Sequence, residues 1–232
     1  MPEPRSQTLF VFRPEPGLTV TLETARAVGL DAVGCPLFLV EPVAWEMPAT
    51  SGFDGLLVGS ANALRHAGDK LDKLLKLPVL AVGEATAEEA KDKGFMVSRT
   101  GKGGLQQLLD GMAGRTRRLL RLAGEARVDL SPPDGIEIET AVVYRTVPLD
   151  ITDDISTRLR KGGVVLLHSG EAARRLRAEC ERLDVPLSTL TIAALAPRIA
   201  EAAGEGWGGV HAARNAIDGE LLELAGELCQ QA

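Results

Sequence analysis

Aromatic residues and positive charge are both in short supply in this sequence. Only 3% of its 232 residues are Phe, Trp or Tyr, and Tyr144 is the single tyrosine. Proteins that bind single-stranded nucleic acid use such rings to stack bases. The 26 Lys and Arg face 32 Asp and Glu, and the resulting net charge of −6 provides no general attraction for phosphate backbones or anionic membranes. We therefore expect neither a nucleic-acid partner nor a membrane partner.

Cysteine is scarce, and long apolar runs are missing. Cys35, Cys180 and Cys229 are far apart and form no CxxC pair, so the sequence indicates neither a disulfide framework nor a thiolate zinc site. No stretch approaches the ~20 apolar residues of a membrane-spanning helix. The N-terminal segment MPEPRSQTLFVF lacks the apolar core of a signal peptide. These features predict a protein that stays in the reducing cytoplasm.

Motifs for nucleotides and metals are also missing. The first apolar run is followed by Arg13 and two prolines instead of GxGxxG, and TGKGGLQ at 100–106 does not match GxxxxGK[ST]. The three histidines, His66, His168 and His211, are dispersed, so we expect no bound metal. His168 and Ser169 are neighbours at the end of a predicted strand, where adjacent side chains point apart, which argues against a nucleophile and its base. The sequence therefore predicts no cofactor.

Short runs of Val, Leu and Ile alternate with amphipathic, helix-like stretches along most of the chain. The predicted strands are at 8–12, 53–59, 78–83, 117–124, 162–170, 189–195 and 208–213, and the predicted helices at 61–76, 86–94, 105–112, 155–161, 171–183, 197–206 and 218–231. Strands that are apolar throughout are buried on both faces, as in parallel sheets covered by helices on each side. The pattern predicts a doubly wound α/β architecture.

Two extended segments, at 34–45 and 135–149, interrupt this alternation. They predict that the chain leaves one sheet and later returns to it, which gives a discontinuous domain at 1–35 plus 147–232 and an inserted domain at 42–140. The tethers at 36–41 and 141–146 would form an antiparallel pair, and together they would act as a hinge over a ligand cleft.

Hydroxyl residues follow several predicted strands. Ser60, Thr86 and Ser169 lie at the carboxyl ends of parallel strands, where such sheets bind ligands and helix N-termini attract anions. The same residues are good helix caps whatever the function, and Thr86 with Glu89 matches a capping box. Both interpretations are compatible.

Several short motifs occur in order from about Leu9 to the C-terminus: FRP at 12–14, CPLFLVEP, FDGLLVGSANAL, LAVGEATAEEAKDKGF, LLRLAGEAR, VVYRTVP, VVLLHSGEAA and IAALAPRIAEAAGEGW. Taken together, they resemble the uroporphyrinogen-III synthase family. One departure is the Ala196-Pro197-Arg198 segment, where the family often has a hydroxyl residue after the proline. The resemblance implies two flavodoxin-like domains. It also implies a lyase of porphyrin, tetrapyrrole and heme biosynthesis that cyclises hydroxymethylbilane to uroporphyrinogen III without cofactor or metal.

The resemblance places Ser60, Thr86, Tyr144 and Ser169 along the cleft, with Tyr144 as the catalytic candidate. A substrate with many carboxylates needs local positive charge, and Arg13, Arg65, Arg145, Arg174 and Arg198 lie near predicted strand ends or tethers. Among these we select Arg13, Arg145 and Arg198 as substrate-binding candidates.

Two other functions remain open for such a sequence. A two-domain module could bind a small anion without turnover. A catalytically idle, synthase-like regulatory domain is the second alternative, although no basic helix-turn-helix segment accompanies the predicted domains. No self-association stripe is evident on the predicted helices, so a monomer is expected.

Overall fold

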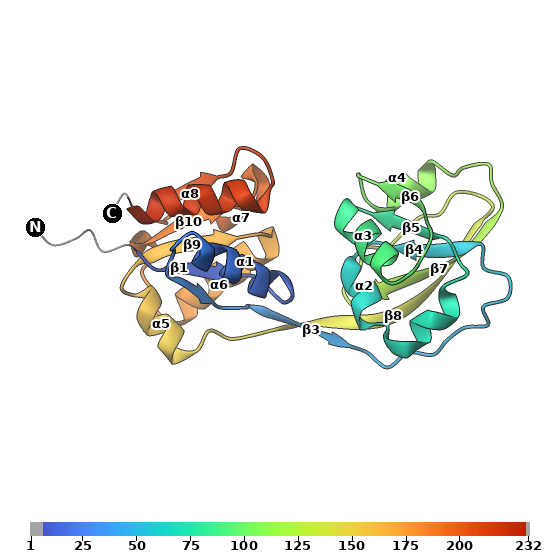
Figure 1. The fold of residues 1–232 in the computed structure, drawn as a ribbon, viewed down its shortest axis with the longest axis horizontal. Helices are drawn as coiled ribbons and strands as arrows, with labels where there is room; N and C mark the ends of the chain where they lie inside the picture. The colour runs from blue at the N-terminus through green and yellow to red at the C-terminus, as the bar shows by residue number, and fades with distance from the viewer. Residues whose placement is uncertain (1–6, 231–232) are drawn as a thin grey trace, which may run out of the picture. The chain divides into compact units, whose positions relative to one another are not determined.

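The computed structural model describes residues 7–230 and divides into two compact α/β units. The first unit comprises the residues up to Leu39 together with those from Pro148 onward, and the second is Val40–Val147. Each unit has a parallel sheet with helices on both faces (Figure 1). The predicted doubly wound α/β fold class is confirmed.

Within the described residues, the first unit contains five parallel strands in the order β11-β10-β9-β1-β2. They are β1 (Leu9–Phe12), β2 (Ala32–Gly34), β9 (Gly163–Leu167), β10 (Leu190–Ala194) and β11 (Gly209–Ala212). Counted along the unit, this is the 2-1-3-4-5 order of flavodoxin-like sheets. One face is covered by α1 (Gly17–Ala27) and α8 (Asp218–Gln230), and the other by α5 (Asp153–Leu159), α6 (Gly170–Arg182) and α7 (Pro197–Ala203). The short 3-10 helix η2 (Leu187–Thr189) precedes β10.

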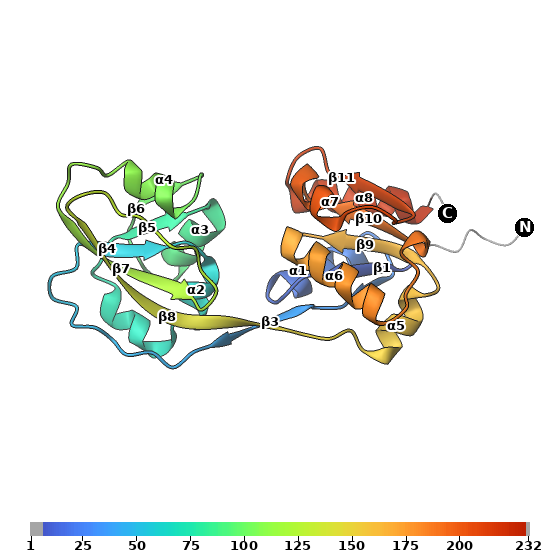
Figure 2. The same ribbon diagram turned by 180° about the vertical axis from the view of Figure 1, so that it is seen from behind.

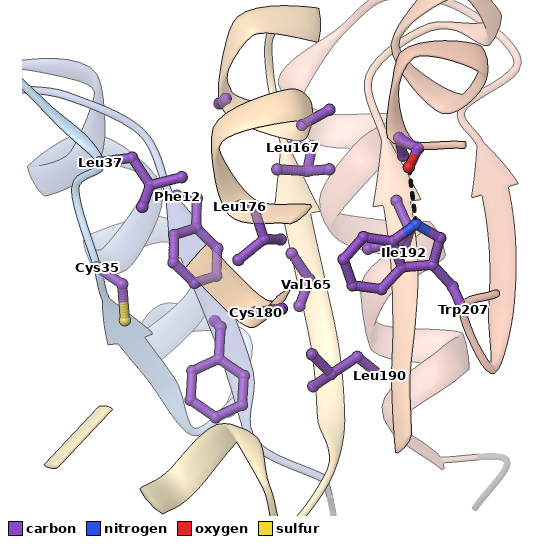
Figure 3. Packing of buried hydrophobic residues seen from close by; sticks show 14 of the residues in the cluster. Phe12, Cys35, Leu37, Val165, Leu167, Leu176, Cys180, Leu190, Ile192 and Trp207 are labelled. Carbon is purple, nitrogen blue, oxygen red and sulfur yellow. Dashed lines mark hydrogen bonds between the residues drawn. The ribbon is translucent and has the colours of Figure 1, made fainter. Parts of the chain in front are cut away.

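The core on the α6 face shows why these strands are apolar throughout (Figure 3). Phe12, Val165 and Ile192, from β1, β9 and β10, pack with Leu176 of α6 in one cluster. The alternate residues of the same strands, such as Val11, face α1 and α8. Because helices cover both faces, nearly every position of these strands is apolar, and the partly exposed Thr191 of β10 is an exception.

The second unit contains a six-stranded sheet in the order β3-β8-β7-β4-β5-β6 (Figure 2). Its strands are β3 (Phe38–Pro42), β4 (Gly55–Val58), β5 (Val79–Val82), β6 (Val97–Gly101), β7 (Arg117–Gly124) and β8 (Ile136–Pro148). The five parallel strands follow the order 3-2-1-4-5, the other common doubly wound arrangement. One face is covered by α2 (Ala61–His66), the 3-10 helix η1 (Gly68–Leu74) and α3 (Glu84–Asp92), and the other by α4 (Leu105–Asp110).

Strand β8 has two roles along its length. From Ile136 to Tyr144 it pairs in parallel with β7. On its other side it lies next to β3, and the amide of Val43 donates to the carbonyl of Val143 at 3.0 Å. The amide of Leu149 donates to the carbonyl of Leu37 at 2.8 Å, so the paired residues run in opposite directions. The predicted antiparallel pair of connecting strands is therefore present.

Some elements differ from the prediction. The sequence patterns do not predict helix α1 or strands β2 and β6, because α1 mixes β-branched residues into a weak stripe, β2 is only three residues long, and β6 is an edge strand with the polar side chains of Ser98, Arg99 and Thr100. The predicted helix at 61–76 breaks at Gly68, whose φ of +69° is left-handed. Gln231, the end of the last predicted helix, lies outside the described residues.

The capping box predicted at Thr86 is wrong. Gly83, with φ of +81°, is the N-cap of α3, so the helix begins at Glu84 and Thr86 lies inside its first turn. Glycine permits this early start because it carries no Cβ. Between residues 7 and 230, no helix combines the length and the apolar character that crossing a membrane requires.

Candidate functional site

Doubly wound sheets bind ligands beyond the carboxyl ends of their strands, where the strand order reverses. In the first unit this reversal lies between β1 and β9, and in the second it lies between β4 and β7. A ligand site is therefore expected beside the residues that follow these four strands.

In the second unit a cavity of about 150 Å³ lies at this reversal point. Its wall includes Ser60, which follows β4, and Tyr144 on β8. The remaining lining residues are Gly59, Leu105, Arg121, Leu122, Ala123, Gly124, Ala126, Arg127 and Val128. Two of the candidate site residues thus share one cavity.

The position of Tyr144 depends on a glycine across the strand pair. A Cβ on Gly124 would lie 2.6 Å from Cζ of Tyr144, so only glycine allows the ring to lie over the end of β7. The ring of His66 is 6.3 Å away, centroid to centroid. Burial and the neighbouring Arg65 lower the pKa of His66, which favours a neutral imidazole beside the phenol.

Ser60 is the N-cap of α2, and its Oγ accepts a hydrogen bond from the amide of Asn62 at 3.3 Å. The hydroxyl proton stays available to a ligand, because a serine hydroxyl donates as well as accepts. Thr86, in contrast, is buried within α3 and is not among the residues that line this cavity.

Two arginines in the cavity wall were missed as functional candidates. Arg121 is only 6% exposed and lies on β7, and Arg127 follows the same strand. Burial and the charge of Arg127 lower the pKa of Arg121. The available signal was an arginine between leucines in RRLLRLAG, a strand predicted to be buried on both faces.

Arg145 and Arg65 are already paired with carboxylates. The Nε and Nη2 atoms of Arg145 donate to Oε2 of Glu41 at 3.0 and 2.8 Å, and Arg145 is exposed. Nε of Arg65 donates to Glu89 at 2.7 Å. A ligand carboxylate at either guanidinium would compete with these partners.

In the first unit Arg13 and His168 follow the two strands at the reversal point. Nη1 of Arg13 donates to Asp218 at 2.5 Å and to Thr21 Oγ1 at 3.1 Å. Nε2 of His168 lies 3.7 Å from Asp218. Burial and the charge of Arg13 outweigh that carboxylate and lower the pKa of His168 to about 4. No sequence motif could connect Asp218 with Arg13, because the two residues are 205 positions apart in the chain.

The other candidates of the first unit lie at helix starts. Ser169 is the N-cap of α6, and its Oγ accepts from the amide of Ala172 at 3.1 Å. Arg198 is exposed in the first turn of α7, whose N-cap Ala196 has no capping side chain. Arg174 is exposed on α6. Within the described part of the chain, no group of three or more His, Cys, Asp or Glu side chains could hold a metal ion.

The chain has two doubly wound units, and each has polar side chains at its reversal point. It therefore belongs to the class of α/β proteins that bind small molecules beyond the carboxyl ends of their strands. A family model described as uroporphyrinogen-III synthase HemD matches residues 20–222. The chain belongs to the uroporphyrinogen-III synthase family, which confirms the resemblance seen in its motifs. This is a family of lyase-type enzymes in heme biosynthesis that act on a tetrapyrrole substrate.

Solved structures of this family share the fold. The uroporphyrinogen-III synthetase of Helicobacter pylori is 18% identical, with a TM-score of 0.66 over 96% of this chain and 99% of that one. A mutant uroporphyrinogen III synthase of the extremely thermophilic bacterium Thermus thermophilus is 14% identical, with a TM-score of 0.56 over 97% and 99%. The comparison with curated proteins finds no match.

Proposed function

We propose that this chain is a uroporphyrinogen-III synthase that cyclises hydroxymethylbilane to uroporphyrinogen III with inversion of ring D. The observation that carries the proposal is the family match over residues 20–222. The polar residues at both reversal points support it, since a substrate with many carboxylates needs hydrogen-bond donors and cations at its binding site.

The reaction balances without an added reactant. The C–O bond of the terminal hydroxymethyl group breaks, and the hydroxyl leaves as water with the N–H proton of its pyrrole, which gives an azafulvene. The azafulvene carbon bonds to the substituted α-carbon of ring D, and the proton moves from the nitrogen of ring D to that of the first ring, which gives a neutral spiro intermediate. The bond from ring D to its original bridging carbon then breaks, that carbon bonds to the free α-carbon of ring D, and the proton displaced from this carbon returns to the ring D nitrogen. Because an electron-rich pyrrole expels the hydroxyl readily, the enzyme contributes mainly the orientation of the two reacting ends. Without that orientation the chain closes to the uninverted type I ring.

Tyr144 is the proposed catalytic residue, as a hydrogen-bond donor to the leaving hydroxyl. Its half-buried position in the cavity supports this role. Ser60 would bind substrate through its free hydroxyl proton, and Thr86 would act through the first turn of α3, which follows β5. Ser169, at the start of α6, would present that helix's N–H groups to a carboxylate.

The three proposed substrate-binding arginines differ in exposure and in the carboxylates that already pair with them. Arg198 is exposed at the start of α7. Arg13 would have to exchange Asp218 for a substrate carboxylate, and Arg145 would have to exchange Glu41. We therefore expect substrate binding by Arg198 to require a smaller free-energy cost than binding by Arg13 or Arg145, each of which must first give up an ion pair.

The test is incubation with hydroxymethylbilane made in place by the preceding enzyme, followed by chromatography of the oxidised products. Type III should accumulate in proportion to the protein, and chelators or nucleotides should make no difference. If every protein concentration yields type I alone, the synthase proposal fails. The alternative of an anion-binding module without turnover would then be favoured.

We further propose that the protein acts as a monomer in the cytoplasm. The three cysteines are free and buried, and burial raises the pKa of Cys35 and Cys180 to about 12, so these thiols are unreactive structural residues. The net charge of −6 also disfavours a nucleic-acid partner. Sedimentation at several protein concentrations tests whether the protein stays monomeric.

A further inference from the structure

We propose that the cavity beside Tyr144 is a carboxylate-binding site whose positive charge comes from Arg121 and Arg127. Its natural occupant would be one acetate or propionate side chain of the substrate, and this identification of the occupant rests on the proposed function. The binding of a carboxylate by the cavity does not depend on it.

The first observation is the burial of Arg121. Arg121 lies on the central strand β7 between Leu120 and Leu122, and only 6% of its surface is exposed. Nη2 donates to the carbonyl of Val128 at 2.9 Å, but among residues 7–230 the buried Nε has no hydrogen-bond partner. A buried guanidinium with an unpaired donor is costly unless a further partner arrives.

The second observation is the absence of a compensating carboxylate in the described part of the chain. Between residues 7 and 230, no carboxylate oxygen lies within 4.0 Å of a guanidinium nitrogen of Arg121 or Arg127. Arg127 instead donates to the backbone carbonyl of Glu125 at 3.0 Å. Asp129 raises the pKa of Arg121, but burial and Arg127 act more strongly in the opposite direction. Two neighbouring cations therefore share a wall of the cavity without an anion between them.

The size and lining of the cavity fit a small oxyanion. About 150 Å³ accommodates a group of a few heavy atoms, such as an acetate or propionate side chain. Ser60 and Tyr144 supply hydroxyl donors, while Leu105, Leu122 and Val128 form apolar walls that strengthen charge-assisted hydrogen bonds. A planar guanidinium also matches a planar carboxylate better than it matches a spherical ion.

The location explains what such a site would do. Tyr144 lines the same cavity, so a carboxylate held there would keep the attached pyrrole near the phenol. Arg121 would then be a specificity-determining residue that selects substrates with an acidic side chain on that ring.

The direct test is NMR of the arginine Nε–H groups in the full chain, titrated separately with sodium propanoate, sodium phosphate and sodium chloride. The Arg121 signal is assigned by its loss in Arg121→Gln. We expect a saturable shift with propanoate and none with chloride at equal ionic strength. Saturation by phosphate alone would overturn the carboxylate assignment, and no saturable shift with any anion would overturn the site.

Binding of uroporphyrin III, the stable oxidised product with eight carboxylates, tests the link to substrate. Arg121→Gln should weaken its binding roughly tenfold to hundredfold, the range expected for a lost charge-assisted hydrogen bond. Arg127→Gln, at an exposed position, should weaken it roughly threefold to tenfold. The matched control is Arg117→Gln at the opposite end of β7, which should stay within about twofold.

If Arg121→Gln does not unfold cooperatively, Arg127→Gln decides the outcome. Wild-type affinity in both folded variants, or in Arg127→Gln where only that variant folds, would overturn the substrate assignment even if the protein makes type III product. If the protein makes only type I product, the proposed function fails, while the propanoate titration still decides whether the cavity binds a carboxylate.

Discussion

Tyr144 and Gly124 form a pair in which each residue limits the other. The phenol lies over the end of β7 only because residue 124 has no side chain, and this contact holds the hydroxyl at the cavity. A tyrosine in VVYRTVP is therefore restrained by tertiary contacts that its own strand does not supply.

Tyr144→Phe should lower the rate of type III formation about 5- to 150-fold without changing the melting temperature. Phenylalanine keeps the ring against Gly124 and removes only the hydroxyl, and the proposed hydrogen bond from this hydroxyl to the leaving group would contribute about 1–3 kcal/mol. Tyr144→Ala would remove the ring too and cost a further 3–5 kcal/mol or so of stability if the ring is well packed. Single-turnover rates and thermal melts measure both effects. A Phe variant within twofold of wild type in rate and isomer ratio would make Tyr144 purely structural.

His168 should make stability depend on pH. Its pKa in the folded protein is about 4, below its ordinary value of 6.5, so the folded state disfavours the charged imidazole. Between these two values the unfolded chain binds the proton and the folded chain does not. Stability is thus complete above about pH 6.5 and falls as the pH drops towards 4, by at most about 3 kcal/mol.

Denaturant unfolding at several pH values tests this effect. His168→Asn should flatten the curve between about pH 4 and 6.5, while His211→Asn, at an exposed position on β11, should leave it unchanged. An identical slope for wild type and His168→Asn would show that His168 does not titrate as described.

Helix α6 is held to the segment before α5 by one buried carboxylate. The side chain of Glu179 is 2% exposed and accepts hydrogen bonds from the amide of Ile151 at 2.9 Å and from Arg182 at 2.6 Å. Arg175 lies 3.1 Å away, and the hydrogen bond from Arg182 lowers the pKa of Glu179 despite its burial. The helix therefore depends on a charge that faces inward.

Glu179→Gln should destabilise the protein by about 1–3 kcal/mol, because the neutral amide cannot satisfy both arginines and the Ile151 amide. Glu181→Gln is the matched control on the same helix, since Glu181 is exposed and forms a surface ion pair with Arg177 at 3.1 Å. We expect the control to change stability by less than about 1 kcal/mol. Equal unfolding midpoints for the two variants would contradict this role of Glu179.

For the whole molecule, the proposal is that each unit can fold without the other. The ends of the second unit are neighbours, because Val43 and Val143 are hydrogen-bonded, and Leu37 and Leu149 are similarly paired at the edge of the first unit. Each unit also has its own buried clusters on both faces of its sheet. The chain between the units can therefore be cut or bridged without opening a core.

A fragment of residues 38–148 should melt cooperatively, and so should a chain in which 40–147 is replaced by a short Gly/Ser turn. Circular dichroism and calorimetry check both products. If either product is unfolded at 20 °C or so while the full chain is folded, its unit depends on the other and the proposal of independent folding is wrong.

Local patterns were sufficient for the alternation of strands and helices. The runs LFVF, GLLV and GVVLL are apolar at every position, which is typical of strands in a parallel sheet covered on both faces. Local patterns did not predict α1, where Thr and Val dilute the apolar stripe. They also misplaced the start of α3, because Gly83 has a positive φ and the helix begins directly after it. The family motifs in order also fixed the expected reaction class.

Only the tertiary structure decided which charged groups meet. Arg13 pairs with Asp218 across 205 positions of sequence, and Arg145 pairs with Glu41 across 104. No local pattern contains such partners, because the fold and not the spacing brings them together. The same holds for Arg121, which the sequence shows inside an apolar strand, while the tertiary structure makes it the wall of a cavity. Periodicity reports which face a residue occupies, and only packing determines what it contacts there.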